Sequence, residues 1–151
     1  MPQSLAAVYL HLVFSTKERR LFLQDRAMRE ELHKYIGGVS KTLECAPIRI
    51  GGVEDHVHVL ARFGRTLSIA EWVKELKRLS SIWVHERGPL HAGFQWQNGY
   101  GVFSVSRSKL DDVTAYVEGQ EDHHRRMSFQ DELRAMLRKH GMEYDERYLW
   151  D

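Results

Sequence analysis

Apolar residues along the chain follow the two spacings that distinguish strands from helices. Short apolar runs rich in β-branched and aromatic residues predict four strands, at 7–14, 47–53, 56–63 and 100–106. Only Glu54-Asp55 separates the second run from the third, so these two strands are expected to form an antiparallel hairpin.

Apolar residues at three- and four-residue spacings predict amphipathic helices between these strands. The first such helix covers 25–44. The second begins at Ser68, which is in the position to form a capping box with Glu71. Gly88-Pro89 marks the point by which this helix has ended.

Two further helices are expected after the last strand, one over about 108–124 and one that Ser128 caps and Gly141 ends. The order is therefore β-α-β-β-α-β followed by two helices. This α+β order is that of a ferredoxin-like or RRM-like fold, with a four-stranded antiparallel sheet and two crossover helices. Because no repeat or linker interrupts the pattern, a single domain over residues 1–151 is predicted, with a peripheral acidic tail at 143–151.

Composition narrows the classes of function. The 22 Lys and Arg residues nearly balance the 21 Asp and Glu residues, so any contact with nucleic acid must come from local patches. The single cysteine, Cys45, excludes an intrachain disulfide and any site with several cysteine ligands. The apolar run near the N-terminus precedes its basic residues, unlike a signal peptide, and no run reaches the ~18 residues of a membrane span. A cytoplasmic protein without a membrane partner is expected.

The clearest chemical signal is the pair His56 and His58 within "EDHVHVL". Side chains alternate along a strand, so both imidazoles share one face while Val57 enters the core on the other. Two imidazoles at this spacing are within reach of one metal ion. The simpler interpretation is a pair of surface or half-buried histidines that hydrogen-bond to the backbone, and the dipeptide alone leaves both open.

A polar cluster in the third predicted helix offers further groups. Tyr116 and Gln120 are four residues apart, so they share one helix face. Placed over the two histidines, Gln120 would supply a neutral oxygen ligand and leave positions open for water and substrate. The alternative for Tyr116 is a half-buried helical tyrosine without chemistry. Five other tyrosines compete with it on composition alone: Tyr9, Tyr35, Tyr100, Tyr144 and Tyr148.

Taken in order, these motifs resemble a known family. A His-hydrophobic-His strand followed by Tyr-x-x-x-Gln on a late helix is similar to the single-tyrosine HUH transposases, the TnpA-type enzymes of insertion sequences that move as single-stranded DNA. The similarity covers nearly the whole chain, in the stretches HLVFSTKERR, EDHVHVL, WVKELKRLSS, FQWQNGYGVFSVS and YVEGQEDHH. Relatives found beside repeated palindromes carry an Asn-Pro pattern after the tyrosine. This chain instead keeps Gln120 and His123-His124, which groups it with the insertion-sequence enzymes.

The resemblance implies that Tyr116 attacks a DNA phosphodiester, giving a 5′-phosphotyrosine link and a free 3′-hydroxyl. A second 3′-hydroxyl can reverse the attack, so no nucleotide cofactor is needed. A divalent ion, Mg²⁺ or Mn²⁺, held by His56, His58 and Gln120 would polarise the scissile phosphate. His11, His123 and His124 are expected to support these groups.

The family also implies a nucleoid-associated homodimer that binds hairpins at the transposon ends, with the tyrosine helix of one subunit able to act in the site of the other. Local basic clusters supply candidates for DNA contact, and phosphate contacts account for most nucleic-acid affinity. The candidates are Lys17, Arg19, Arg20, Arg62, Lys74, Lys77, Arg78 and Arg107. Phe94, Trp96 and Tyr100 are candidates for stacking on unpaired bases, although packing in the core or at a dimer seam is the favoured interpretation.

Three other functions remain open on the sequence. A non-catalytic nucleic-acid binder would share the sheet but would not need His56, His58 and Tyr116 together. A metal-dependent phosphodiesterase would use metal-bound water and would tolerate loss of the Tyr116 hydroxyl. A nuclease that nicks plasmid or viral origins would share the chemistry but usually carries extra domains.

Overall fold

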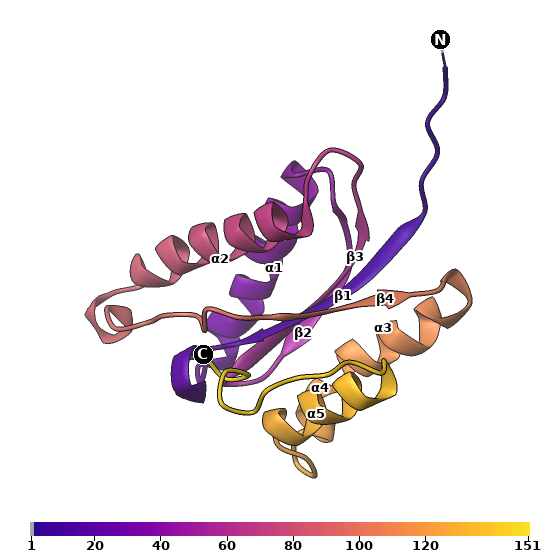
Figure 1. Cartoon of the computed structure of the whole chain (residues 1–151). Helices are drawn as coiled ribbons and strands as arrows, with labels where there is room; N and C mark the ends of the chain where they lie inside the picture. The colour runs from indigo at the N-terminus through magenta and orange to yellow at the C-terminus, as the bar shows by residue number, and fades with distance from the viewer. Residues whose placement is uncertain (1) are drawn as a thin grey trace.

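The computed structural model of the chain describes residues 2–151 and is built on one four-stranded antiparallel sheet (Figure 1). The strand order β2-β3-β1-β4 confirms the predicted ferredoxin-like plan. The strands are β1 (Val8–Ser15), β2 (Ala46–Gly52), β3 (His56–Phe63) and β4 (Gly101–Val105). β1 and β3 are therefore the central strands, and β2 and β3 form the predicted hairpin.

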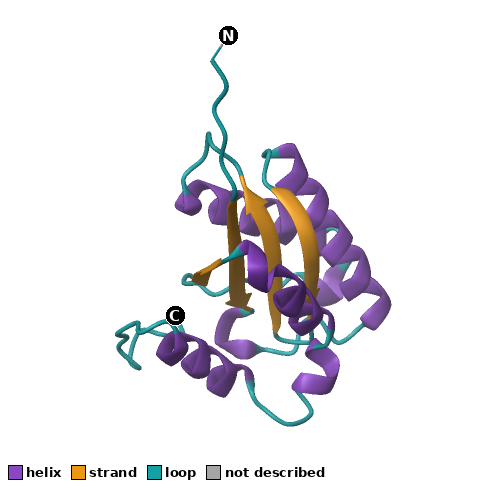
Figure 2. Ribbon diagram, turned by 90° about the vertical axis from the view of Figure 1, so that its right-hand side faces the viewer, coloured by secondary structure: helices purple, strands orange, loops and turns teal. Residues whose placement is uncertain are grey.

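Helices cover both faces of the sheet (Figures 1 and 2). The two crossover helices, α1 (Arg26–Thr42) and α2 (Ile69–His85), lie on one face. On the other face lie α3 (Leu110–Glu118), α4 (Gln120–His123) and α5 (Phe129–Lys139). Short 3-10 turns occur at Lys17–Arg19, Pro89–His91 and Arg107–Lys109.

The main core lies between the sheet and the two crossover helices. β1 contributes Leu10, Leu12 and Phe14, and β3 contributes Val57 and Val59, all of them buried. The predicted cap of α2 is present, because the Ser68 hydroxyl accepts a hydrogen bond from the Glu71 amide at 3.1 Å. Of the two tryptophans of α2, Trp72 is fully buried, whereas Trp83 is half-buried and stacks on Tyr35.

A second, smaller core lies on the opposite face of the sheet. Val13 and Phe103 pack there against Phe129, Leu133 and Leu137 of α5. Because side chains alternate along each strand, the residues between the main-core positions of β1 and β3 point into this second layer. The histidines of interest occupy these positions, so α3, α4 and α5 cover them.

The prediction of one continuous helix over 108–124 is wrong. The chain makes a 3-10 turn at Arg107–Lys109, then α3, and α4 begins only after Gly119. The backbone at Gly119 (φ −87°, ψ 18°) departs from helical values, and glycine has a low helix propensity. Three helices rather than two therefore follow β4, and the break sets Gln120 on a different segment from Tyr116.

The C-terminal tail does not behave as the peripheral segment that its composition predicts. Leu149 and Trp150 pack against the second core, and the Trp150 ring meets Phe129 at a centroid distance of 6.2 Å. The Asp151 carbonyl accepts a hydrogen bond from the Gly99 amide at 2.8 Å. No helix within residues 2–151 has the length and apolar character that a membrane span requires.

Candidate metal and nucleophile site

His56 and His58 lie side by side on β3 beneath the helices of the second layer. Their ring centroids are 5.1 Å apart, and neither side chain is exposed. His56 donates through Nδ1 to Asp55 Oδ1 at 2.7 Å, which leaves Nε2 directed toward the helices. His58 Nδ1 lies 2.7 Å from His11 Nε2, so its Nε2 is directed the same way. The second nitrogens of both rings therefore face one point.

Glu132 of α5 occupies the centre of this arrangement, and sequence reasoning missed it. Its Oε1 accepts a hydrogen bond from His58 Nε2 at 3.0 Å and lies 3.4 Å from His56 Nε2. Its side chain is only 1% exposed. A signal was available, because positions 129, 132, 133, 136 and 137 form one helix face that is otherwise apolar. A carboxylate on a buried stripe requires partners, and the histidines are those partners.

Gln120 and His124 complete the cluster from α4 and its end. Gln120 Oε1 lies 3.2 Å from His56 Nε2 and accepts from His124 Nε2 at 2.9 Å. His124 Nε2 also lies 3.2 Å from Glu132 Oε2. Gln120 thus lies against His56, one of the two predicted histidines, and His124 is in direct contact with the same group of atoms rather than behind it.

Tyr116 of α3 lies at the margin of the cluster and is half-buried. Its hydroxyl donates a hydrogen bond to Glu132 Oε2 and lies 3.4 Å from His123 Nε2. A cleft of about 740 Å³ opens over β4 between α3 and α5, and Tyr116, Glu132, His11 and His123 line its floor and walls. Tyr116 is therefore the member of the cluster through which a ligand in the cleft can meet the buried groups.

The electrostatics of the cluster centre on an ionised carboxylate. Burial by itself raises the pKa of Glu132, but hydrogen bonds from the surrounding histidines outweigh burial and hold that pKa well below its usual range. Burial likewise acts to lower the pKa of His56, but its bonds to Asp55 and Glu132 raise it to about 9. His56 and Glu132 therefore form a buried ion pair at neutral pH.

The neighbouring groups are held neutral. Burial lowers the pKa of His58 to about 4, and burial together with His58 lowers that of His11 to about 3. A neutral His58 that donates from Nε2 must accept at Nδ1, so His11 donates to it. Burial, followed by the charge of Glu132, raises the pKa of the Tyr116 hydroxyl well above its ordinary value.

The donor set fits a divalent metal ion. One ligand atom each from His56, His58, His124 and Glu132 lie within 4.8 Å of one another, and the Gln120 oxygen touches two of these residues. A set of two or three imidazole nitrogens with carboxylate and amide oxygens suits Mn²⁺ or Zn²⁺. Mg²⁺ prefers oxygen ligands, so it would be bound mainly by the carboxylate and amide oxygens of the set. Asp55 and His11 hold the rings of His56 and His58 from behind, as the outer partners of ligating histidines do.

The residues predicted to contact DNA do not form one surface. Lys17, Lys74, Lys77 and Arg78 line a single groove beside α2. Arg19 packs over the Trp150 ring, Arg20 pairs with Glu18, and Arg107 is exposed in the 3-10 turn before α3. Of the aromatic candidates, Phe94 and Trp96 belong to the main core, whereas Tyr100 is 40% exposed.

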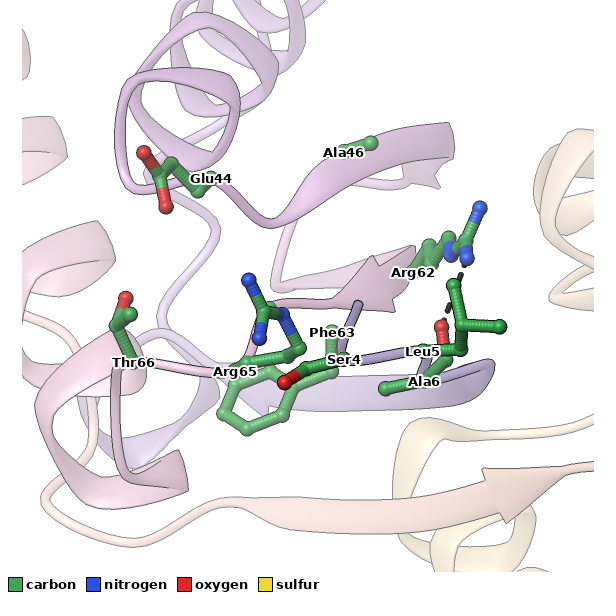
Figure 3. Close-up of a pocket in the computed structure, with 10 residues that line it drawn as sticks. Ser4, Leu5, Ala6, Glu44, Ala46, Arg62, Phe63, Arg65 and Thr66 are labelled. Carbon is green, nitrogen blue, oxygen red and sulfur yellow. Dashed lines mark hydrogen bonds between the residues drawn. The ribbon is translucent and has the colours of Figure 1, made fainter. Parts of the chain in front are cut away.

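Arg62 lies apart from the others at a shallow hollow of about 230 Å³ (Figure 3). Its guanidinium donates to the Ala6 carbonyl at 2.7 Å and so ties the N-terminal segment to β3. Arg65 lines the same hollow, with Glu44 at its rim. Neither arginine is directed into the histidine cluster.

Comparison with protein families gives one match that spans most of the chain. Residues 4–120 match the model of a family described as "Transposase IS200 like". The matched range includes His56, His58, Tyr116 and Gln120 but ends before His124 and Glu132. No curated protein matches the chain in sequence.

Two solved structures share the fold. A crystal structure of a candidate transposase from Deinococcus radiodurans R1 has a TM-score of 0.61 and 22% identity, covering 80% of this chain and 95% of that chain. A REP-associated tyrosine transposase bound to a REP hairpin has a TM-score of 0.60 and 13% identity, covering 82% of this chain and 72% of that chain. At these identities the likeness establishes the architecture of the sheet and its helices.

Proposed function

Since the chain belongs to the IS200-like transposase family, we propose that it is a tyrosine HUH transposase that cleaves and rejoins single-stranded DNA. The whole chain, residues 1–151, acts as one transposase domain in this proposal. The observation that carries it is that His56, His58 and the Tyr116 hydroxyl all meet at Glu132, with Gln120 against His56 and Tyr116 lining an open cleft.

Tyr116 is the nucleophile in the proposed reaction. Its hydroxyl gives up its proton to an acceptor in contact with it, its oxygen forms a bond to phosphorus, and the bond from phosphorus to the 3′-oxygen of the preceding nucleotide breaks; the leaving 3′-oxygen takes up a proton. The product is a 5′-phosphotyrosine and a free 3′-hydroxyl, and attack by another 3′-hydroxyl reverses the step and joins new ends. Because its pKa is raised, the hydroxyl holds its proton at neutral pH. The acceptors in contact with it are Glu132 and His123.

His56, His58 and Gln120 would hold the metal ion, and Glu132 and His124 extend the predicted ligand set. Bound there, Mg²⁺ or Mn²⁺ would polarise the scissile phosphate and stabilise its added negative charge. The residues of the chain orient this set: Asp55 fixes the ring of His56, and His11 fixes the ring of His58.

The proposed substrate is single-stranded DNA whose ends fold into hairpins. The REP hairpin in the complex of the structural neighbour supports this choice. A homodimer is proposed from the resemblance to the family. Within the single chain, α3 sets Tyr116 beside His58, at a ring-centroid distance of 5.8 Å. This geometry is compatible with a site formed within one subunit, and exchange of the helix between subunits stays a prediction.

A denaturing gel tests the proposal. The protein is mixed with labelled single-stranded DNA from the flanks of its own gene and Mn²⁺ and is then boiled in detergent. Wild type is expected to give a labelled band shifted by the mass of the protein, absent in Tyr116→Phe and His56→Ala and retained in the control Tyr148→Phe. DNA cleavage without the covalent band would favour a phosphodiesterase that uses water, and binding without cleavage would favour a non-catalytic binder.

A further inference from the structure

A groove of about 620 Å³ runs between α2 and the loop at residues 95–100. It lies beside the helix layer opposite the one that covers the histidine cluster, so it is separate from the cleft that leads to Tyr116. Figure 1 shows α2 on the side of the sheet away from α3 and α5. We call the residues that line it the α2 groove: Lys17, Ala70, Val73, Lys74, Lys77, Arg78, Ser81, Gln95, Trp96, Gln97, Asn98 and Tyr100.

The charge of the α2 groove has one sign. Four cations line it, and no acidic residue does. Arg78 is partly neutralised by Glu75, at 2.6 Å from its Nε. Lys17 and Lys74 form no ion pair with any residue in the described range 2–151, so their charges are not neutralised by a neighbour there. In a chain whose net charge is only +1, this concentration of positive charge favours an anionic ligand.

The wall opposite α2 carries groups suited to nucleobases. The Tyr100 ring is 40% exposed, with the Lys77 ammonium 5.6 Å from its centroid. Gln95 and Asn98 are exposed beside it and offer amide donors and acceptors. A cationic groove that combines an exposed aromatic ring with amides matches the usual design of sites for unpaired nucleotides.

The loop that carries these groups is held in place before any ligand arrives. The Lys77 ammonium donates to the carbonyls of Gln97, Asn98 and Gly99 at 2.8, 3.2 and 2.8 Å. The backbone amide of Ser15 donates to the side-chain oxygen Oε1 of Gln97 at 2.7 Å, and the backbone amide of Gln97 donates to the Ser15 carbonyl at 3.0 Å. Lys77 therefore has a structural task, and Lys17, Lys74 and Tyr100 are the groups left to meet a ligand.

The α2 groove begins at the same end of the sheet as the histidine cluster, so one DNA strand can pass the active site and reach the groove. Lys17 follows β1 by two residues, and Ser15 at the end of β1 is paired with His56 across the sheet. The groove and the histidine cluster thus occupy opposite faces at the same strand end.

We propose that the α2 groove binds unpaired nucleotides of the DNA strand, with a base stacked on Tyr100 and phosphates at Lys17 and Lys74. The proposal deepens the proposed function, since it takes single-stranded DNA as the substrate. It predicts that the protein binds the DNA strand at a second site, on the face of the sheet opposite the cleaved phosphodiester.

Fluorescence anisotropy with a labelled oligo-dT strand tests the groove in the Tyr116→Phe background, where no covalent product forms. Tyr100→Ala is expected to weaken binding about 10-fold, because a base-aromatic stack is lost, while Tyr100→Phe retains it. Lys17→Ala with Lys74→Ala should reduce the slope of log affinity against log salt by about 1. The double variant Lys34→Ala, Lys41→Ala removes two exposed lysines of α1 and should leave binding unchanged.

Equal binding by Tyr100→Ala and Tyr100→Phe would overturn the stacking, and with it the proposal. So would an equal loss of affinity for a blunt duplex and for oligo-dT, since the groove would then read duplex phosphates. Thermal melting of each variant shows whether it is folded. Failure of the groove is distinguishable from failure of the proposed function, because the covalent band is measured on protein in which the groove is intact.

Discussion

Glu132 Oε1 accepts a hydrogen bond from Nε2 of His58 at 3.0 Å and thereby joins α5 to the central strand β3. This contact links residues 74 positions apart and brings a carboxylate to the point that both histidines face. The matched family range ends at residue 120, so the carboxylate comes from a segment beyond it. The helices after β4 thus do more than cover the sheet: they complete the candidate site.

Replacing Glu132 by Gln tests whether its charge belongs to the metal site. The substitution keeps the shape of the side chain but removes the negative charge opposite His56, so Mn²⁺ affinity is expected to fall at least about 10-fold. Isothermal titration with Mn²⁺ measures the affinity, and Glu143→Gln, on an exposed position of the tail, is the matched control. Equal affinity in wild type and Glu132→Gln would remove Glu132 from the ligand set.

Gly51 controls how closely α3 approaches the sheet. A Cβ at this position would collide with the carbonyl oxygen of Val117, the residue after Tyr116. Gly51→Ala is therefore expected to push α3 away from β2, to lower the free energy of unfolding by about 1–3 kcal/mol and to reduce formation of the covalent DNA adduct. Chemical denaturation and the denaturing gel measure the two effects.

Gly38 provides the control for that substitution. It lies within α1, and a Cβ there would have no atom within 4 Å. Gly38→Ala is expected to raise the free energy of unfolding by about 0.5–1 kcal/mol, because alanine favours helix and restricts the unfolded chain. If Gly51→Ala were as well tolerated as Gly38→Ala, the close approach of α3 to β2 would not position Tyr116.

His33 makes the fold sensitive to acid. Its Nε2 is buried without a hydrogen-bond partner within residues 2–151, and burial lowers its pKa from 6.5 to about 4. Between these values the unfolded chain binds more protons than the folded one, so stability is full above pH 6.5 and is lost as the pH falls toward 4. His33 is expected to lower the free energy of unfolding by about 2 kcal/mol when the pH falls from 7 to 5.

Denaturant titrations at pH 7 and pH 5 measure this loss of unfolding free energy. Over that interval His33→Met should lose about 2 kcal/mol less of its unfolding free energy than wild type does. His91→Gln, on the 3-10 turn after α2, is the control and should lose as much as wild type. Equal acid sensitivity of wild type and His33→Met would show that His33 carries a proton in the fold at pH 5.

The parts of the fold that depend on local pattern were predictable from the sequence. Alternation around Val57 placed His56 and His58 on the face away from the main core, and the Ser68 cap fixed the start of α2. The spacing of Tyr116 and Gln120 predicted that both would approach these histidines, although the break at Gly119 was not foreseen. The low helix propensity of glycine disfavours helix at Gly119 but does not predict the direction that the chain takes after α3.

The parts that depend on contacts between distant segments were not predictable. The apolar face of α5 marks Glu132 as a buried carboxylate but does not identify its partners, since the pairing of α5 with β3 is set by packing and not by local sequence. The tail appeared solvated because Glu143 to Asp151 is rich in charge, yet Leu149 and Trp150 pack beside Phe129 and Asp151 binds the Gly99 amide. The α2 groove likewise combines residues from three separate stretches.

Peptide mapping of the DNA-protein adduct tests the central claim most directly. Trypsin releases residues 110–125 as one peptide, in which Tyr116 is the single tyrosine. After reaction with single-stranded DNA and nuclease trimming, mass spectrometry is expected to find this peptide heavier by a 5′-phosphonucleotide, with the added mass on Tyr116. An adduct on a peptide that carries another tyrosine, or cleaved DNA with residues 110–125 unmodified, would contradict the assignment of Tyr116 as the nucleophile.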